Sequence, residues 1–279
     1  MQSSKIPTET WDPLGLRAWE GHPATMDYSH RHNDLELNLV TRGSVSYFSG
    51  GRRFVIPERT LVLFWAIAPH QLTESRDGTQ MYWMTLPLAW FLHQNWPDRF
   101  YKAVLNAQLV YDQQVSEQDP QRFQQWQQDL SRNTAQDREV VYLEVEARLK
   151  RMAYAMETSA RTQFPAPLVT AGHHQSQAEK MAGYLAEHYL EDVSIEQVAG
   201  IVGLHPNYAM NVFRKSYGQT MIAYLTQCRI AHAQQLLVTT NHNVVQIALE
   251  SGFGSVSQFY SAFHKQCGMS PKAYRESLR

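Results

Sequence analysis

The sequence feature that most constrains the fold is a motif that occurs twice in the last third of the chain. Residues 194–225 and 243–275 carry the same small, glycine and aromatic residues in the same order, 49 or 50 positions apart. The matching pairs are Ala199 with Ala248, Gly203 with Gly252, Phe213 with Phe263, Gly218 with Gly268, Thr220 with Ser270 and Tyr224 with Tyr274. A unit repeated at this spacing predicts an all-helical domain built from two similar structures.

Each copy has the pattern of a helix-turn-helix. Ser194 and Asn243 are each followed three positions later by glutamine, which is typical of a capped helix start. The glycine in the middle of each copy supplies the positive φ of a tight turn, and the second helix has one apolar side. A helix presented in this way fits the major groove of DNA. We therefore predict helix-turn-helix units at residues 194–217 and 243–267, within a DNA-binding domain over residues 178–279.

The second copy also carries a family signature. It reads Gly252-Phe253-x-Ser255-x-Ser257-x-Phe259-x3-Phe263-x-Lys265, followed by Gly268-Met269-Ser270-Pro271 and Tyr274-Arg275. This pattern resembles the signature of the AraC-type transcription regulators, although His264 stands where a second basic residue is common. The resemblance implies a regulator that binds double-stranded promoter DNA in a sequence-specific way, activates transcription with RNA polymerase as a partner, and is not an enzyme.

The helical wheel places one set of side chains on the solvent-facing side of each recognition helix. In the first copy these are Asn207, Met210, Asn211 and Arg214, and in the second they are Val256, Ser257, Gln258 and Ser261. Asparagine and glutamine suit adenine, arginine suits guanine, and valine can contact a thymine methyl group. The predicted phosphate contacts are Lys215, Lys265, Lys272 and Arg275. Any of these residues could instead be an ordinary solvated one. We expect the first helix to carry more base specificity, because the second has fewer long hydrogen-bonding side chains.

The N-terminal half has a pattern of short strands and turns. Residues 35–39 alternate apolar and polar side chains, residues 44–48 and 52–56 flank a Gly50-Gly51 turn, and residues 60–66 form an apolar run. His30-x-His32-x3-Glu36-x6-Gly43 resembles the first motif of the cupins, although Arg59 stands where their second motif has glycine. The predicted fold is α+β, with an N-terminal cupin-like β-barrel (jelly roll), appended helices and a C-terminal all-α domain.

Three residues of the cupin-like motif form a candidate metal site with a fourth. His30, His32 and Glu36 have the same parity, so they point to one face of an extended strand. With His70 from a neighbouring strand they make three imidazoles and a carboxylate, a set able to bind Zn, Ni, Fe or Mn. The alternative is a polar lining for a sugar pocket, with no metal cofactor required. A metal would make the protein a metal-responsive regulator or, as a further alternative, a cupin metalloenzyme.

Aromatic residues gather in the same half of the chain. A sugar offers an apolar ring face to an aromatic plane and a polar rim to hydrogen-bonding groups. The predicted ligand contacts are Trp19, Tyr28, His32, Glu36, Arg42 and Trp83. Residues 63–66, 69–73 and 207–210 are similar to one activator of the family, and that resemblance implies a small sugar such as an α-galactoside as the inducer.

Helical periodicity follows the strands. An apolar stripe runs along the last predicted helix of this half and consists of Val141, Val145, Leu149, Met152 and Met156. It either packs on the barrel or forms a homodimer interface. Residues 161–177 have no such periodicity and contain proline and glycine, so we predict a linker after a ligand-sensing and dimerisation domain over residues 1–160.

Charge and cysteine content limit the partners and the compartment. The net charge is −1, and from Thr170 onward 8 Lys and Arg residues against 7 Asp and Glu residues give only +1. DNA binding must therefore depend on locally placed cations and on dimer avidity. The two cysteines, Cys228 and Cys267, are typical of a reducing compartment. No apolar segment predicts a signal peptide or a membrane span, so we expect a cytoplasmic protein.

Overall fold

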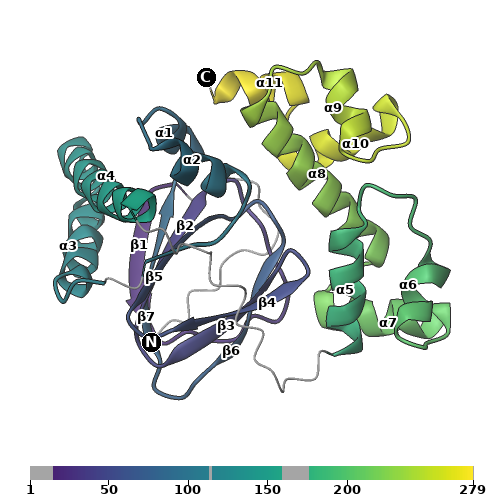
Figure 1. The fold of residues 1–279 in the computed structure, drawn as a ribbon, viewed down its shortest axis with the longest axis horizontal. Coiled ribbons are helices and arrows are strands. Elements are labelled where there is room, and N and C mark those ends of the chain that lie inside the picture. The colour runs from purple at the N-terminus through teal and green to yellow at the C-terminus, as the bar shows by residue number, and fades with distance from the viewer. Residues whose placement is uncertain (1–14, 113–114, 159–175, 279) are drawn as a thin grey trace.

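The computed structural model describes residues 15–112, 115–158 and 176–278. Strands dominate the N-terminal half and helices form the C-terminal part (Figure 1). The fold class is therefore α+β, as predicted. The linker predicted at residues 161–177 lies outside the described residues, apart from its last two positions.

The described strands form two antiparallel sheets. They are β1 (Arg17–Gly21), β2 (Leu35–Arg42), β3 (Ser44–Ser49), β4 (Arg52–Pro57), β5 (Thr60–Trp65), β6 (His70–Ser75), β7 (Gln80–Leu86) and β8 (Val110–Asp112). One sheet has the strand order β1-β7-β2-β5-β8 and the other has the order β4-β3-β6.

The arrangement agrees with the predicted jelly roll, and the described strands form two separate sheets and not one closed barrel. Gly43, with φ of +80°, turns the chain from β2 in the first sheet to β3 in the second. Such a backbone angle is easy for glycine alone, and the switch of sheets leaves edges that are not hydrogen-bonded to each other. A bridge between His30 and His70 ties the segment before β2 to the start of β6.

The two faces of β2 have different surroundings. Leu35, Leu37 and Leu39 point to the apolar core on the outer side of the five-stranded sheet. Glu36 and Asn38 alternate with them and point to the inner side, between the two sheets. The inner side is therefore apolar in part and polar where β2 begins.

Four helices pack on the outer side of the first sheet (Figure 1). They are α1 (Leu88–Leu92), α2 (Asp98–Leu105), α3 (Asp119–Arg132) and α4 (Ala135–Thr158). The apolar stripe of α4 lies in this core, and none of its five residues is more than 4% exposed. The stripe is used within the protomer, so the predicted homodimer would need another surface.

The C-terminal part contains both predicted helix-turn-helix units. Its helices are α5 (Gln177–Glu187), α6 (Ile195–Ile201), α7 (Pro206–Tyr217), α8 (Met221–Thr239), α9 (Val244–Glu250), α10 (Val256–Cys267) and α11 (Pro271–Ser277). The first unit packs around Phe213 and Tyr224, and the second around Phe259, Phe263 and Tyr274. The long helix α8 contributes to both cores and joins them.

Local signals explain where these helices begin and turn. Ser194 forms a full capping box with Gln197, and the Asn243 side chain accepts a hydrogen bond from the Gln246 backbone. Gly252 has φ of +85°, and a Cβ atom there would lie 2.8 Å from the Tyr189 carbonyl oxygen. Glycine is thus required at this turn for its backbone angle and for space.

Two further predictions concern the chain as a whole. Cys228 and Cys267 are both buried free thiols. Among the described residues, every helix is too short or too polar to cross a lipid bilayer.

Candidate DNA interface and ligand site

The recognition helix of the first unit presents its predicted contacts to solvent. Asn207, Met210, Asn211, Arg214 and Lys215 are all exposed on α7. On the opposite side of the helix, Ala209, Phe213 and Tyr217 are buried. The exposed side combines amide and cationic groups, which suits contacts with base edges and phosphates.

The second recognition helix, α10, is arranged in the same way. Ser257, Gln258, Ser261 and Lys265 are exposed, and Val256 is half-buried. Lys272, at the start of α11, is exposed with its Nζ atom 3.8 Å from a carboxylate oxygen of Glu276. These residues stay predictions as DNA contacts, but their side chains are free to meet a duplex.

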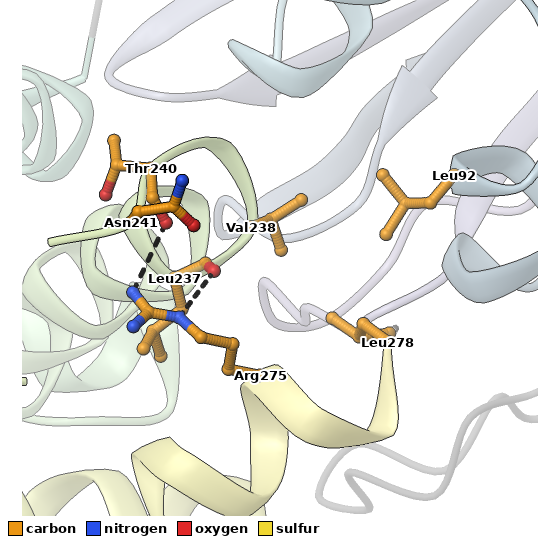
Figure 2. Close-up of a pocket in the computed structure, with 7 residues that line it drawn as sticks. All are labelled: Leu92, Leu237, Val238, Thr240, Asn241, Arg275 and Leu278. Carbon is orange, nitrogen blue, oxygen red and sulfur yellow. Dashed lines mark hydrogen bonds between the residues drawn. The ribbon is translucent and has the colours of Figure 1, made fainter. Parts of the chain in front are cut away.

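Arg275 is the exception among the predicted phosphate contacts. Its guanidinium group donates hydrogen bonds to the carbonyl oxygens of Leu237 and Thr240, at 3.1 Å and 3.4 Å (Figure 2). These carbonyls belong to the C-terminal end of α8, where the helix leaves them without partners, so Arg275 satisfies them. A phosphate contact would require this side chain to leave the end of α8.

The pocket beside Arg275 lies between the two halves of the chain. Figure 2 shows Leu92 of α1 opposite Val238 of α8 and Leu278, with Arg275 and Asn241 at the polar side. Its volume is about 130 Å³. This volume is small for a disaccharide.

The predicted cluster of three histidines and a glutamate is formed on the inner side. The Nε2 atoms of His32 and His70 lie 3.0 Å and 3.1 Å from Oε1 of Glu36, and Nε2 of His30 lies 4.0 Å from it. All four side chains are buried. Burial lowers the pKa of His30 to about 3, with a further contribution from His70. The histidines hold the pKa of Glu36 well below its usual range despite burial, so Glu36 is an anion.

Aromatic rings lie on the same inner side. Trp19 and Trp83 are opposite each other on β1 and β7, with ring centroids 6.2 Å apart and nearly parallel planes. Burial, followed by the charge of Glu36, raises the pKa of Tyr47. The Oδ1 atom of Asn38 is buried without a hydrogen-bond partner among the described residues. Aromatic faces and hydrogen-bonding groups therefore lie on the same inner side of the sheet.

Two predicted ligand contacts lie elsewhere. The ring of Tyr28 packs over Gly218 at the end of α7. A Cβ atom added to Gly218 would be 2.6 Å from Cδ1 of Tyr28. Arg42 is exposed at the end of β2. Tyr28 thus belongs to the contact between the two halves, and the structure gives neither residue a place beside Glu36.

The segment that carries the histidines also contacts the DNA-binding part. His30 and His32 face Glu36, while Arg31 between them donates hydrogen bonds to the Gln227 carbonyl oxygen at 2.6 Å and to Oε1 of Gln234 at 3.0 Å. The next residue but one, Asn33, accepts a hydrogen bond from the hydroxyl of Tyr274 on α11. Alternate residues of one extended segment therefore serve the two halves of the molecule.

Further contacts support this interface. Gly51 lies close against Gly183 of α5. A Cβ atom added to Gly51 would be 2.8 Å from the Cα atom of Gly183. Arg53 pairs with Glu179 at the start of α5. These contacts join the β3–β4 hairpin to the first helix of the C-terminal part.

Comparison with known families agrees with the geometry of both halves. Residues 16–153 match the model of the AraC-like ligand binding domain, and residues 186–277 match that of a helix-turn-helix domain. The melibiose operon regulatory protein of Escherichia coli K12 is 33% identical over 262 residues, which are 91% of this chain and 85% of that protein. The chain belongs to the AraC family of transcription regulators. The transcriptional activator RhaR of Klebsiella pneumoniae, also similar, is 25% identical over 92% of this chain and 90% of its own length.

Sequence reasoning missed several residues of this AraC-family regulator. Asn38 has the same parity as Glu36, so the alternation of β2 could have found it. Tyr47 lies on β3 in the other sheet and carried no comparable signal. Arg31 and Asn33 could not be found, because their partners lie about 200 positions along the chain.

Proposed function

We propose that this DNA-binding regulator activates transcription in response to a small sugar that binds between its two sheets. The supporting observation is the inner side itself, where Trp83 lies opposite Asn38 and stacks with Trp19, while Asn38 and His32 form hydrogen bonds with Glu36. An aromatic pair and a set of hydrogen-bonding groups match the two kinds of surface that a pyranose offers. The similarity to the melibiose operon regulatory protein favours an α-galactoside such as melibiose.

The ligand would act through the segment at residues 30–33. A sugar that contacts His32 or Glu36 would shift the segment whose alternate residues hold α8 and α11. Binding changes the arrangement of the domains only to the extent that the sugar prefers one arrangement over another. The role is one of binding and regulation, without catalysis.

The regulator would act as a homodimer on promoter DNA in the cytoplasm, in contact with RNA polymerase. One face of α4 offers a surface for dimer formation, because Val140, Leu143 and Tyr154 are 47%, 60% and 55% exposed. These positions lie on the side opposite to the buried stripe. Two copies would bring four recognition helices to one operator and raise its affinity through avidity.

The DNA part of the proposal is tested by comparing Asn211→Ala with Lys265→Ala. Fluorescence anisotropy with matched and single-base-changed operators would measure both variants at several salt concentrations. We expect Asn211→Ala to relax base preference at one position, at a cost of roughly 1–3 kcal/mol, and Lys265→Ala to weaken all sequences alike with a lower salt dependence. Equal losses on all sequences for both variants would contradict the assignment of Asn211 as a base reader.

The ligand part is tested with two tryptophan variants. Trp83 lies on the inner side, whereas Trp90 lies on the outer side, stacked on Tyr142 with ring centroids 5.2 Å apart. Isothermal titration with melibiose should show binding about fivefold weaker for Trp83→Leu, since an aromatic contact of this kind contributes about 1 kcal/mol. Trp90→Leu is the matched control and should bind as the unmodified protein does. Unchanged binding by Trp83→Leu would place the sugar elsewhere.

A further inference from the structure

We propose that His30, His32, Glu36 and His70 form a binding site for one divalent transition-metal ion. One ligand atom from each of the four side chains can be chosen so that all four lie within 4.8 Å of one another. Ligands bound to one ion at about 2.1 Å lie roughly 3–4 Å apart, so the side chains need only small movements to close around it. This inference goes beyond the sugar-responsive function and does not depend on which sugar binds.

The hydrogen bonds of His70 provide the first independent support. Its Nδ1 atom lies 3.0 Å from the Ala68 carbonyl oxygen, and its Nε2 atom lies 3.1 Å from Oε1 of Glu36. When Nδ1–H donates to the carbonyl oxygen, the Nε2 lone pair is directed at the side of Oε1 where an ion bound by both atoms would lie. An Nδ1–H bond to a carbonyl oxygen is typical of histidines that bind metals.

His30 gives a second observation. Its Nε2 atom is buried and has no hydrogen-bond partner among the described residues, although it lies 4.0 Å from Oε1 of Glu36. The side chain is only 6% exposed. A buried polar atom without a partner is costly, and a metal ion beside Glu36 would give this lone pair a ligand role.

Asn38 orients the carboxylate for the same purpose. Its Nδ2 atom donates to Oε2 of Glu36 at 2.9 Å, so the second oxygen is held by a neutral donor and Oε1 is directed at the three histidines. An outer partner of this kind fixes the direction of a metal-binding carboxylate.

The types of donor atom define the class of ion. Three imidazole nitrogens and one carboxylate oxygen suit Zn²⁺, Ni²⁺, Co²⁺ or Fe²⁺. Ca²⁺ and Mg²⁺ prefer sites made of oxygen atoms alone, so they should not compete. Because His30 and His32 flank Arg31, a bound ion would also fix the segment that contacts α8.

The test uses the full chain, first treated with a chelator and then dialysed against Zn²⁺, Co²⁺ or Mg²⁺. We expect elemental analysis to find one Zn²⁺ or Co²⁺ per chain and no retained Mg²⁺, and Co²⁺ to give visible absorption bands typical of four ligands. Zn²⁺ at 100 times its Kd should raise the melting temperature by roughly 5–10 °C.

Variants separate this site from other histidines of the chain. His70→Gln and Glu36→Gln should each lose the tightly held ion and the rise in melting temperature, while His242→Gln, whose side chain is 43% exposed and lies outside the cluster, should lose neither. Far-UV circular dichroism and operator binding identify any variant that fails to fold, and the other variant then decides. The proposal would be overturned if the unmodified chain did not retain Zn²⁺. It would also be overturned if His70→Gln and Glu36→Gln both retained as much Zn²⁺ as the unmodified chain. A loss of sugar binding without any effect on metal retention would concern the sugar proposal alone.

Discussion

The contact between Arg31 and α8 makes a quantitative prediction about how the two halves are held together. Its side chain is half-buried, and burial lowers the pKa of Arg31 to about 10, so it remains a cation at neutral pH. Replacing Arg31 by methionine keeps most of the aliphatic stem and removes the donors to Gln227 and Gln234. Hydrogen bonds from charged groups contribute about 1.5–3 kcal/mol each after the exchange with water. Because the two bonds share one guanidinium group, their contributions do not simply add, and we expect a net loss of about 2 kcal/mol, or about thirtyfold in the equilibrium between joined and separated halves.

The distribution of tryptophan makes this measurable. All seven tryptophans lie before residue 127, so their fluorescence reports on the N-terminal half during urea unfolding. The helical circular-dichroism signal has a large contribution from α5 to α11. Loss of the contact should move the two transitions apart, because domains that no longer stabilise each other unfold separately.

A double-mutant cycle tests whether the effect comes from this pair. Gln234→Leu should act in the same direction, and the double variant Arg31→Met with Gln234→Leu should lose less than the sum of the single effects. Arg17→Met, at an exposed position on β1, is the control and should change stability by less than about 0.5 kcal/mol. If the fluorescence and circular-dichroism transitions of Arg31→Met coincided, they would refute the reasoning. Strictly additive losses in the double-mutant cycle would refute it as well.

Three other predictions follow from described contacts. Gly51→Ala should move the same two transitions apart, since the residue has φ of +81° and its new Cβ would meet Gly183; a transition like that of the unmodified protein would contradict this. Arg148→Met should lower the free energy of unfolding of the N-terminal half by about 3–5 kcal/mol, because it leaves two paired aspartates buried; urea titration measures it. Burial raises the pKa of Cys228 and Cys267 to about 12, so a thiol reagent at pH 7 should react only after denaturation.

The C-terminal half could be predicted closely because its signals are local. The start of α6 depends on a side chain three residues away, and the turn at Gly252 depends on a backbone angle that other residues rarely adopt. The predicted units at 194–217 and 243–267 each contain two helices, as the structure describes. Such short-range patterns are written directly into a sequence.

The N-terminal half shows where local reasoning ends. The equal parity of His30, His32 and Glu36 predicted that their side chains lie on one side of the strand. In the structure a bridge between His30 and His70 brings His70 beside them. Parity could not decide whether the strands close into a barrel, because closure depends on pairing between distant edges. It also could not place Tyr28, whose ring packs on Gly218, or Arg275, whose guanidinium group caps α8. Each of these depends on how separately formed elements dock.

Helix α8 connects the two helix-turn-helix units rigidly. Residues near the start of α8 pack in the core of the first unit, and residues near its end pack in the core of the second. Arg31 donates a hydrogen bond to α8 between these two regions. A helix of this length curves only gently, so a movement of the ligand-binding half that shifts α8 should move both helix-turn-helix units together. Base changes in the operator at the position of either unit can reduce the affinity for DNA by different amounts. They should nevertheless leave the effect of the ligand on that affinity the same.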